Sequence, residues 1–170
     1  MARTVYVNGS YVSERNAVVH YEDRGYQFAD GVYEVILVRL GRLIDEVQHL
    51  DRLERSLREL TISMPMGRLP LEAVIHETLR RNSVQEGIVY LQVTRGVAPR
   101  DHTFPKAPIS SLVVAAKRRV WPAFGSEPKG GLGVLVRDER WARCDVKSIS
   151  LLPNVLAKEK AKQLGAVEAI

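Results

Sequence analysis

The sequence has a single cysteine, Cys144, which excludes an internal disulfide and has no metal-ligand spacing around it. It also lacks any apolar run near the ~20 residues of a membrane span, and the start MARTVYVNG has no signal-peptide core. The net charge of +5 is scattered, without a long block of lysine and arginine. These absences favour a cytoplasmic protein that uses neither a metal, a membrane nor a nucleic acid.

Strand patterns and helix patterns mix through the first 120 residues. Asn8-Gly9 and Gly41 predict hairpin turns, because these residues tolerate positive φ. Leucines recur every three or four positions after Glu46, and a second such pattern begins near Pro70, as is typical of amphipathic helices. Because strands and helices do not alternate strictly, we expect an α+β domain. The expected strands are 4–7, 11–12, 32–40, 88–94 and 111–116.

A second domain is expected after a linker. Residues 121–131 contain two prolines with glycines and serines, which is typical of an interdomain connection. The predicted boundaries are therefore 1–120 for the first domain, 121–131 for the linker and 132–170 for the second domain. The second part offers strands at 132–136 and 167–170 and a helix at 153–165, too few to close a sheet. We therefore expect this domain to be incomplete.

Lys147 stands in a stretch that alternates in character over 145–149, as a short strand does, sharing a face with Asp145 and Ile149. A desolvated lysine amine on a rigid element is a nucleophile that forms Schiff bases with aldehydes. A surface lysine with a solvated ammonium explains the same residue equally simply.

Four sequence blocks resemble one known family. They are DRGYQFADGVYEVI at 23–36, HLDRLERSL at 49–57, VTRGVAPRDHTFP at 93–105, and DVKS with LLPN between 145 and 154. Together they are similar to the fold-type IV pyridoxal-phosphate enzymes, and most of all to the D-amino-acid transaminases. The resemblance covers the N-terminal three-fifths of such chains. It implies a complete small N-terminal domain followed by the truncated start of the coenzyme domain.

The resemblance implies roles for two of these residues in holding pyridoxal 5'-phosphate. Lys147 would form the internal aldimine and would then carry the proton at the substrate Cα, as the catalytic residue. Arg52 would bind the coenzyme phosphate, which suits a guanidinium with parallel donors. Periodicity alone favours a surface arginine paired with Glu46 or Glu59. The family's acid for the pyridine nitrogen and its serine-rich phosphate turn would lie beyond Ile170.

The resemblance also implies a substrate site in which Tyr33, Arg100 and His102 bind the α-carboxylate. Arg100 and His102 would be lent across a homodimer interface. Taken without the resemblance, Tyr33 is a core tyrosine and PRDH is a solvated loop stiffened by Pro99 and Pro105.

The expected reaction is the transamination of D-alanine and 2-oxoglutarate to pyruvate and D-glutamate. The alternatives are another class IV pyridoxal-phosphate enzyme, such as an amine transaminase, a branched-chain aminotransferase or an aminodeoxychorismate lyase, or an inactive fragment. The preferred side chain of the substrate does not follow from these residues.

Overall fold

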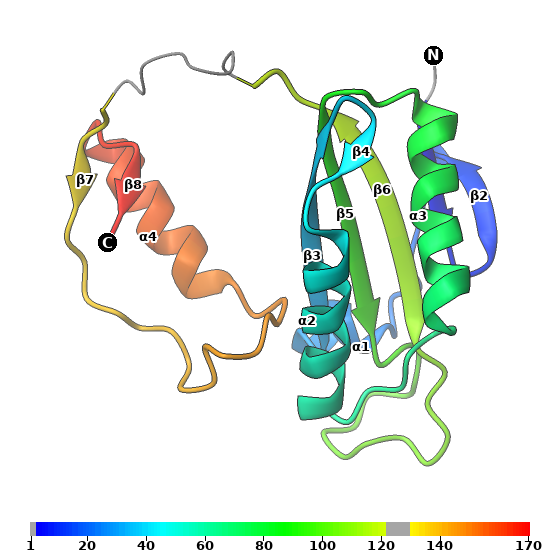
Figure 1. The fold of residues 1–170 in the computed structure, drawn as a ribbon. Helices are drawn as coiled ribbons and strands as arrows, with labels where there is room; N and C mark the ends of the chain where they lie inside the picture. The colour runs from blue at the N-terminus through cyan, green and yellow to red at the C-terminus, as the bar shows by residue number, and fades with distance from the viewer. Residues whose placement is uncertain (1–2, 122–129) are drawn as a thin grey trace. The chain divides into compact units, whose positions relative to one another are not determined.

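The computed structural model describes residues 3–121 and 130–170, which form two compact units (Figure 1). The first unit runs to Trp121 and also includes Val146–Ile149. The second unit holds the described residues 130–145 and 150–170. Most of the predicted linker lies outside the described residues, so the domain boundaries stay a prediction.

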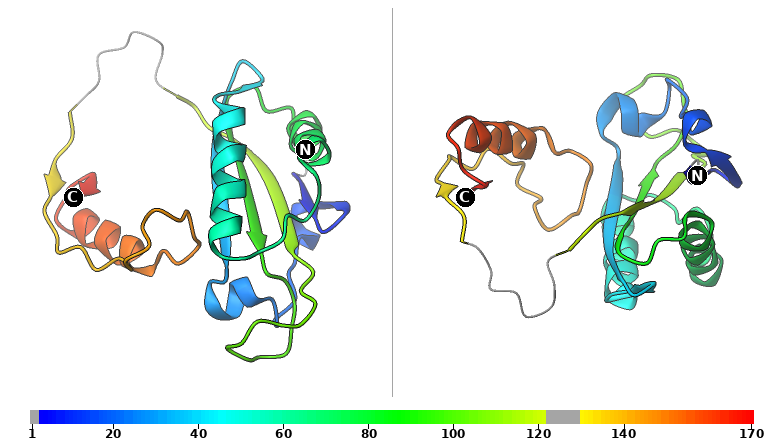
Figure 2. Two further views of the ribbon diagram at one scale, coloured as in Figure 1. Left: turned by 60° about the horizontal axis from the view of Figure 1, so that its bottom comes forward. Right: turned by 90° about the horizontal axis from the view of Figure 1, so that it is seen from above.

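The first unit is an α+β fold, as expected, built on a six-stranded antiparallel sheet in the order β2-β1-β6-β5-β3-β4. Helices α2 and α3 cover one face of this sheet (Figure 2). A five-residue helix, α1, precedes β3 and was not expected from the sequence. The elements are β1 Thr4–Val7, β2 Ser10–Ser13, η1 Glu14–Asn16, α1 Arg24–Phe28, β3 Gly31–Arg39, β4 Arg42–Leu43, α2 Glu46–Glu59, α3 Arg68–Asn82, β5 Gly87–Thr94 and β6 Ser111–Arg118.

Both predicted hairpin turns are present. Asn8 (φ 45°) and Gly9 (φ 97°) join β1 to β2, and Leu40 (φ 49°) and Gly41 (φ 72°) join β3 to β4. Positive φ at both central residues matches the twist of the flanking strands. The expected helices and long strands are confirmed, with ends that differ by a few residues.

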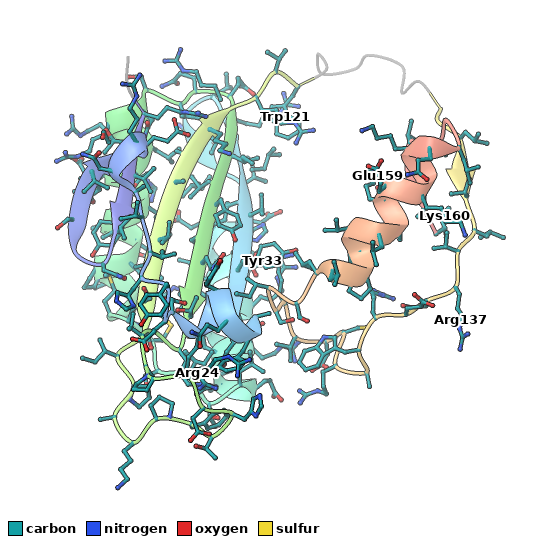
Figure 3. The ribbon with its side chains drawn as sticks, turned by 180° about the vertical axis from the view of Figure 1, so that it is seen from behind. Arg24, Tyr33, Trp121, Arg137, Glu159 and Lys160 are labelled. Carbon is teal, nitrogen blue, oxygen red and sulfur yellow. The ribbon has the colours of Figure 1, made fainter. Side chains whose placement is uncertain are left out.

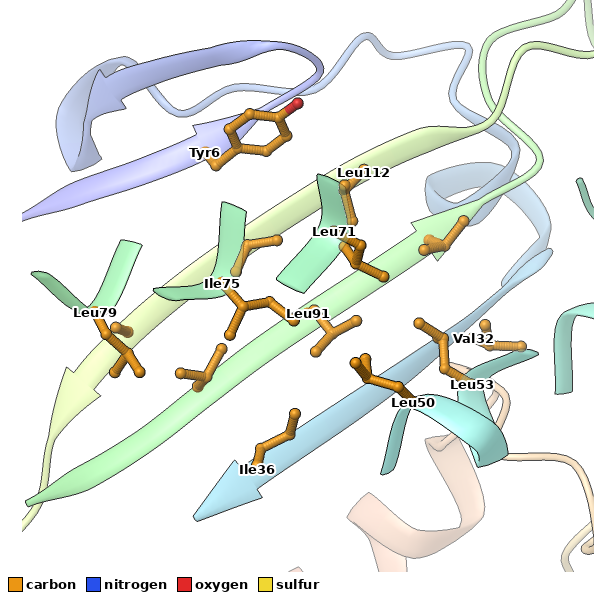
Figure 4. Close-up of a cluster of buried hydrophobic side chains, with 14 of the residues drawn as sticks. Tyr6, Val32, Ile36, Leu50, Leu53, Leu71, Ile75, Leu79, Leu91 and Leu112 are labelled. Atoms are coloured by element: carbon orange, nitrogen blue, oxygen red, sulfur yellow. The ribbon is translucent and has the colours of Figure 1, made fainter. Parts of the chain in front are cut away.

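The core lies between the sheet and helices α2 and α3 (Figure 4). Alternate residues of β3 face it, including Val32 and Ile36, both fully buried. Leu50 of α2 and Leu71 of α3 are fully buried against this face, and each such side chain contributes about 1.5 to 3 kcal/mol of transfer free energy. The same alternation places a charged residue, Glu34, in the core, where it is also fully buried.

The second unit consists of helix α4 Leu152–Gln163 and a parallel pair of short strands, β7 Gly133–Val134 and β8 Glu168–Ala169. The expected strands 132–136 and 167–170 are therefore shorter than predicted. Pro153 stands in the first turn of α4, where its missing N–H costs no helical hydrogen bond.

The strand predicted over 145–149 is not formed. Its only ladder contact among the described residues is an isolated antiparallel bridge between Ser148 and Val32. The alternation itself is real, since Val146 and Ser148 are buried while Lys147 is half-buried. Asp145 is exposed, as this alternation requires, but it belongs to the second unit and pairs with Arg143. Residues 146–149 have the two-residue alternation of a strand, but they lie beside the beginning of a single neighbouring strand, β3.

No helix within the described ranges combines the length and the apolar character that crossing a membrane requires. The same residues contain no group of three or more histidine, cysteine, aspartate or glutamate side chains able to hold a metal ion.

Candidate functional site

Lys147 is fixed by its backbone to the start of β3. Its carbonyl accepts a hydrogen bond from the Tyr33 N–H (3.1 Å), and its own N–H donates a long bond to Ser56 Oγ on α2 (3.4 Å). Two residues on, the Ile149 N–H donates to the Gly31 carbonyl (3.1 Å). The amine is thus carried by a segment bonded to both a strand and a helix of the first unit.

The Lys147 ammonium lies over the aromatic face of Tyr33, with Nζ 4.2 Å from the ring centroid. A cation in this position is attracted by the negative face of the ring. Lys147 is half-buried, and the ring limits the directions from which its amine can be approached. The arrangement suits an amine that must meet one particular carbon.

Tyr33 itself belongs to an aromatic pair on the sheet face opposite the core (labelled in Figure 3). Its ring stacks on Tyr90 of β5, with centroids 6.0 Å apart and 29° between planes. Burial, together with Tyr33, raises the pKa of Tyr90, whose hydroxyl donates to Gln92 Oε1 (2.5 Å). Tyr33 is therefore half-buried beside Lys147 and is not the core tyrosine that its apolar neighbours in sequence allowed.

Arg52 is paired with Glu34. Its Nε donates to Glu34 Oε1 (2.6 Å) and its Nη2 to Oε2 (2.7 Å), while His49 Nδ1 lies 2.8 Å from the same Oε2. The hydrogen bond with Glu34 raises the pKa of Arg52 above its ordinary value, against the lowering effect of burial. Arg52 therefore pairs with the buried Glu34, and not with Glu46 or Glu59 as its position in the helix allowed.

This pairing occupies part of the Arg52 guanidinium. Both parallel donors of the guanidinium are given to Glu34, and the third nitrogen, Nη1, has no hydrogen-bond partner among the described residues. The Arg52 side chain is 45% exposed. Arg52 and Ser56 stand one turn apart on the same side of α2. Helix α2 therefore carries both the arginine and the hydroxyl that meets the Lys147 backbone.

Arg100 and His102 lie on the exposed loop between β5 and β6, beside α1. The guanidinium carbon of Arg100 is 5.0 Å from the centroid of the Phe28 ring, and the His102 ring is 5.5 Å from the same ring, centroid to centroid. In residues 3–121 and 130–170, no hydrogen bond or ion pair joins either side chain to Lys147, Tyr33 or Arg52. The candidate residues thus form two groups.

The sequence left three participants without a role. Glu34 falls within the block at 23–36 but was given no partner there, although a carboxylate among buried apolar residues requires one. His49 stands three residues before Arg52 on one helical surface, a spacing that could have indicated a shared partner. Phe28 carried no signal of its own, because its contacts with Arg100 and His102 come from a loop more than seventy residues away.

Comparisons with known proteins agree with one another. A family model described as amino-transferase class IV matches residues 31–170. The chain is 40% identical over 166 residues to a D-alanine aminotransferase of Staphylococcus epidermidis, covering 98% of this chain and 59% of that protein. It is 42% identical over 168 residues to a D-alanine aminotransferase of Listeria innocua, covering 98% and 58%.

Solved structures share the fold at lower identity. A branched-chain aminotransferase of the thermophilic archaeon Thermoproteus uzoniensis, solved with norvaline, has a TM-score of 0.81 at 22% identity, over 100% of this chain and 59% of that one. An Escherichia coli branched-chain amino acid aminotransferase has a TM-score of 0.86 at 19% identity, over the same shares of the two chains. The chain therefore spans about three-fifths of the length of the proteins that it matches.

Proposed function

Because this chain belongs to the class IV aminotransferase family and has the fold-type IV architecture, we propose that its protein transaminates D-amino acids with pyridoxal 5'-phosphate. The observation that carries the proposal is the Lys147 amine, held over the Tyr33 ring by a segment bonded to β3 and α2. The D-alanine aminotransferases at 40% and 42% identity support the choice of D-amino acids.

The residues present fit this coenzyme. A half-buried amine is available at Lys147, and the free Nη1 donor of Arg52 is available for a phosphate oxygen. When bound, pyridoxal phosphate supplies an aldehyde carbon and an electron sink for the electrons left at the substrate Cα. Glu34 holds the Arg52 guanidinium in place through two hydrogen bonds, so that the phosphate donor is oriented before an anion arrives.

Lys147 would have two tasks in this proposal. Its amine would hold the coenzyme, and the same amine would move the proton at the substrate Cα. The two tasks suit one residue because both need an amine placed next to the reacting carbon.

Tyr33, Arg100 and His102 bind the substrate carboxylate in this proposal. Arg100 and His102 are exposed, and we propose that they reach the Lys147 site of a second subunit in a homodimer. A carboxylate fixed by charged donors at one end and by Lys147 chemistry at the other presents one face of Cα to the amine, which selects one hand of the amino acid.

We propose D-alanine and 2-oxoglutarate as substrates, giving pyruvate and D-glutamate. The exposed, free Cys144 agrees with the reducing cytoplasm, where we expect the protein to act.

The decisive experiment uses the protein as encoded by its complete reading frame, with pyridoxal phosphate added. Pyruvate formation from D-alanine and 2-oxoglutarate is compared with the turnover of L-alanine, L-leucine and a simple amine. Turnover of D-alanine well above the other three supports the proposal. Preference for L-leucine or for the amine would assign the protein to another class IV activity, and the absence of any bound coenzyme would reject the enzymatic proposal.

A further inference from the structure

The loop that carries Arg100 and His102 is attached to the sheet through α1. Arg24, which is 3% exposed, donates from Nη1 to the carbonyl oxygens of Asp101 (2.6 Å) and Thr103 (3.3 Å). These two carbonyls flank His102 in the sequence. One buried guanidinium therefore fixes the backbone on both sides of that histidine.

The Phe28 ring is the common neighbour of the charged groups in this region. The guanidinium carbon of Arg24 lies 4.9 Å from its centroid and that of Arg100 lies 5.0 Å away. The His102 ring packs on Phe28 at 5.5 Å with a 58° tilt. Both side chains assigned to the substrate carboxylate thus rest on one aromatic ring, which limits their rotamers without using their N–H donors.

Arg24 is in turn held by a buried ion cluster. Its Nε donates to Asp30 Oδ2 (2.8 Å), and Arg95, 2% exposed, donates to both oxygens of the same carboxylate (2.8 and 3.0 Å). Burial alone would raise the pKa of Asp30, but the hydrogen bonds from Arg95 and Arg24 hold it below its ordinary value. The carboxylate is therefore ionised at neutral pH and orients the Arg24 guanidinium.

Helix α1 also sits rigidly against the end of β5. Asp23 accepts from the Gly25 N–H (2.8 Å) and from Thr94 Oγ1 (3.0 Å). A Cβ on Gly25 would lie 2.3 Å from Thr94 Cγ2, so any other residue here requires a shift of Thr94 or of the helix. Arg24 and Phe28 are thereby carried on an element that the sheet fixes in place.

We propose that Arg24 and Phe28 are positioning residues for recognition of the substrate carboxylate, since they set the places of Arg100 and His102. This inference rests on the proposed function. Neither residue is assigned contact with the substrate: Phe28 acts through the two side chains on its ring, and Arg24 acts through the carbonyls next to His102. Loss of either changes how well a carboxylate is held and leaves the chemistry at Lys147 intact.

The test compares D-alanine with D-alaninamide, in which a neutral amide replaces the carboxylate. In the protein as encoded by its complete reading frame, Phe28→Leu and Arg24→Lys are each expected to raise the KM for D-alanine about tenfold. We expect the kcat with D-alanine and the kinetics with D-alaninamide to change by less than about twofold. Phe28→Tyr keeps the ring, so its KM for D-alanine should stay close to that of the original protein.

Two control variants test whether losing an arginine–aromatic contact or an arginine hydrogen-bond cluster elsewhere also raises the KM for D-alanine. Tyr11→Leu removes the ring under Arg81, an arginine–aromatic pair at 4.2 Å elsewhere in the first unit. Arg68→Lys shortens another arginine with several partners, bonded to Asp51, Glu54 and Glu72. Neither control should alter the ratio of the two KM values.

Amide hydrogen exchange of residues 100–104 gives a readout that needs no activity. Exchange in this loop should accelerate in Arg24→Lys and Phe28→Leu, and should not change in the two controls. Equal effects on both substrates, or unchanged loop exchange with an unchanged KM for D-alanine, would overturn the inference. If the original protein does not turn over D-alanine, the proposed function fails, and loop exchange alone still decides whether Arg24 and Phe28 order the loop.

Discussion

The two groups of candidate residues are held by opposite means. Lys147 lies on a segment that is hydrogen-bonded to β3 and to Ser56 of α2. Arg52 of α2 is bonded to Glu34, a carboxylate with no solvent exposure. Arg100 and His102 lie on an exposed loop, and what fixes them is a ring and a guanidinium on α1. The first group is thus supported by the core of the first unit, and the second is supported from one side only.

This difference fits the two tasks proposed for the groups. A covalent anchor must keep its geometry through every turnover, and a buried charge pair supplies such rigidity. A group that reads the substrate of a second subunit must face outward, so it cannot be buried in its own chain. The predictions below test this contrast, from the largest expected effect to the smallest.

Replacing Lys147 should have the largest effect. Lys147→Ala removes both the covalent anchor and the group that moves the proton, so turnover should fall at least about a thousandfold. Borohydride reduction should no longer attach the coenzyme to the chain, as measured by mass spectrometry. Lys117→Ala, which removes an exposed lysine of β6, is the matched control. Attachment that persists at another lysine would contradict the assignment.

Glu34→Gln should destabilise the first group strongly. The variant leaves Arg52 and His49 beside a buried neutral amide, and we expect the free energy of unfolding to fall by about 2 to 3 kcal/mol. Urea denaturation measures this loss. The comparison variant is Glu77→Gln, which changes a partly exposed carboxylate that also pairs with two arginines, Arg80 and Arg81. Similar losses in the two variants would show that core burial adds nothing to the Arg52 pair.

Arg100→Ala should impair binding and leave the fold intact. Loss of one charge-assisted hydrogen bond, about 1.5 to 3 kcal/mol, should raise the KM for D-alanine roughly tenfold to a hundredfold. The thermal midpoint should not move, because the side chain is exposed. Equal damage with D-alaninamide would mean that the loop supports structure and does not read the carboxylate.

The smallest effect is expected for Asp30→Asn, in its dependence on pH. Because the pKa of Asp30 is lowered in the folded state, its contribution is complete above the unfolded value of about 3.9 and disappears as the pH falls through the folded pKa. At pH 7 the variant should be less stable than the original protein, because it leaves the buried guanidiniums of Arg24 and Arg95 beside a neutral amide. The difference from the original protein should shrink below about pH 4. A constant difference down to pH 2 would show that Asp30 does not titrate in this way.

Local patterns were enough to predict most elements of the first unit. The hairpins at Asn8-Gly9 and Gly41 were predictable because positive φ is a property of the residue itself. Helices α2 and α3 followed from leucine spacing. Two elements were not predicted correctly from local patterns. Helix α1 is too short to show a periodic signal. The 145–149 segment has the alternation of a strand but forms only one bridge to a neighbour among the described residues.

The sequence predicted which residues are candidates for the site, but it did not predict which residues they contact. Lys147, Arg52, Tyr33, Arg100 and His102 were all indicated by motifs, and their roles stay predictions. The partners of these residues depend on chain segments that are distant in sequence: Glu34 meets Arg52 across eighteen positions, and Arg24 meets Asp101 across seventy-seven.

The sequence by itself determined the family, the α+β character and the residue types available for chemistry, because motifs and periodicity are local properties of the chain. Tertiary structure alone decided that two guanidinium nitrogens of Arg52 donate to the buried Glu34 carboxylate. It also decided that the Lys147 amine lies over the Tyr33 ring and that α1 contacts the loop of Arg100. The physical reason is that a charge or a ring selects its partner by proximity and burial, and both exist only after the chain has folded.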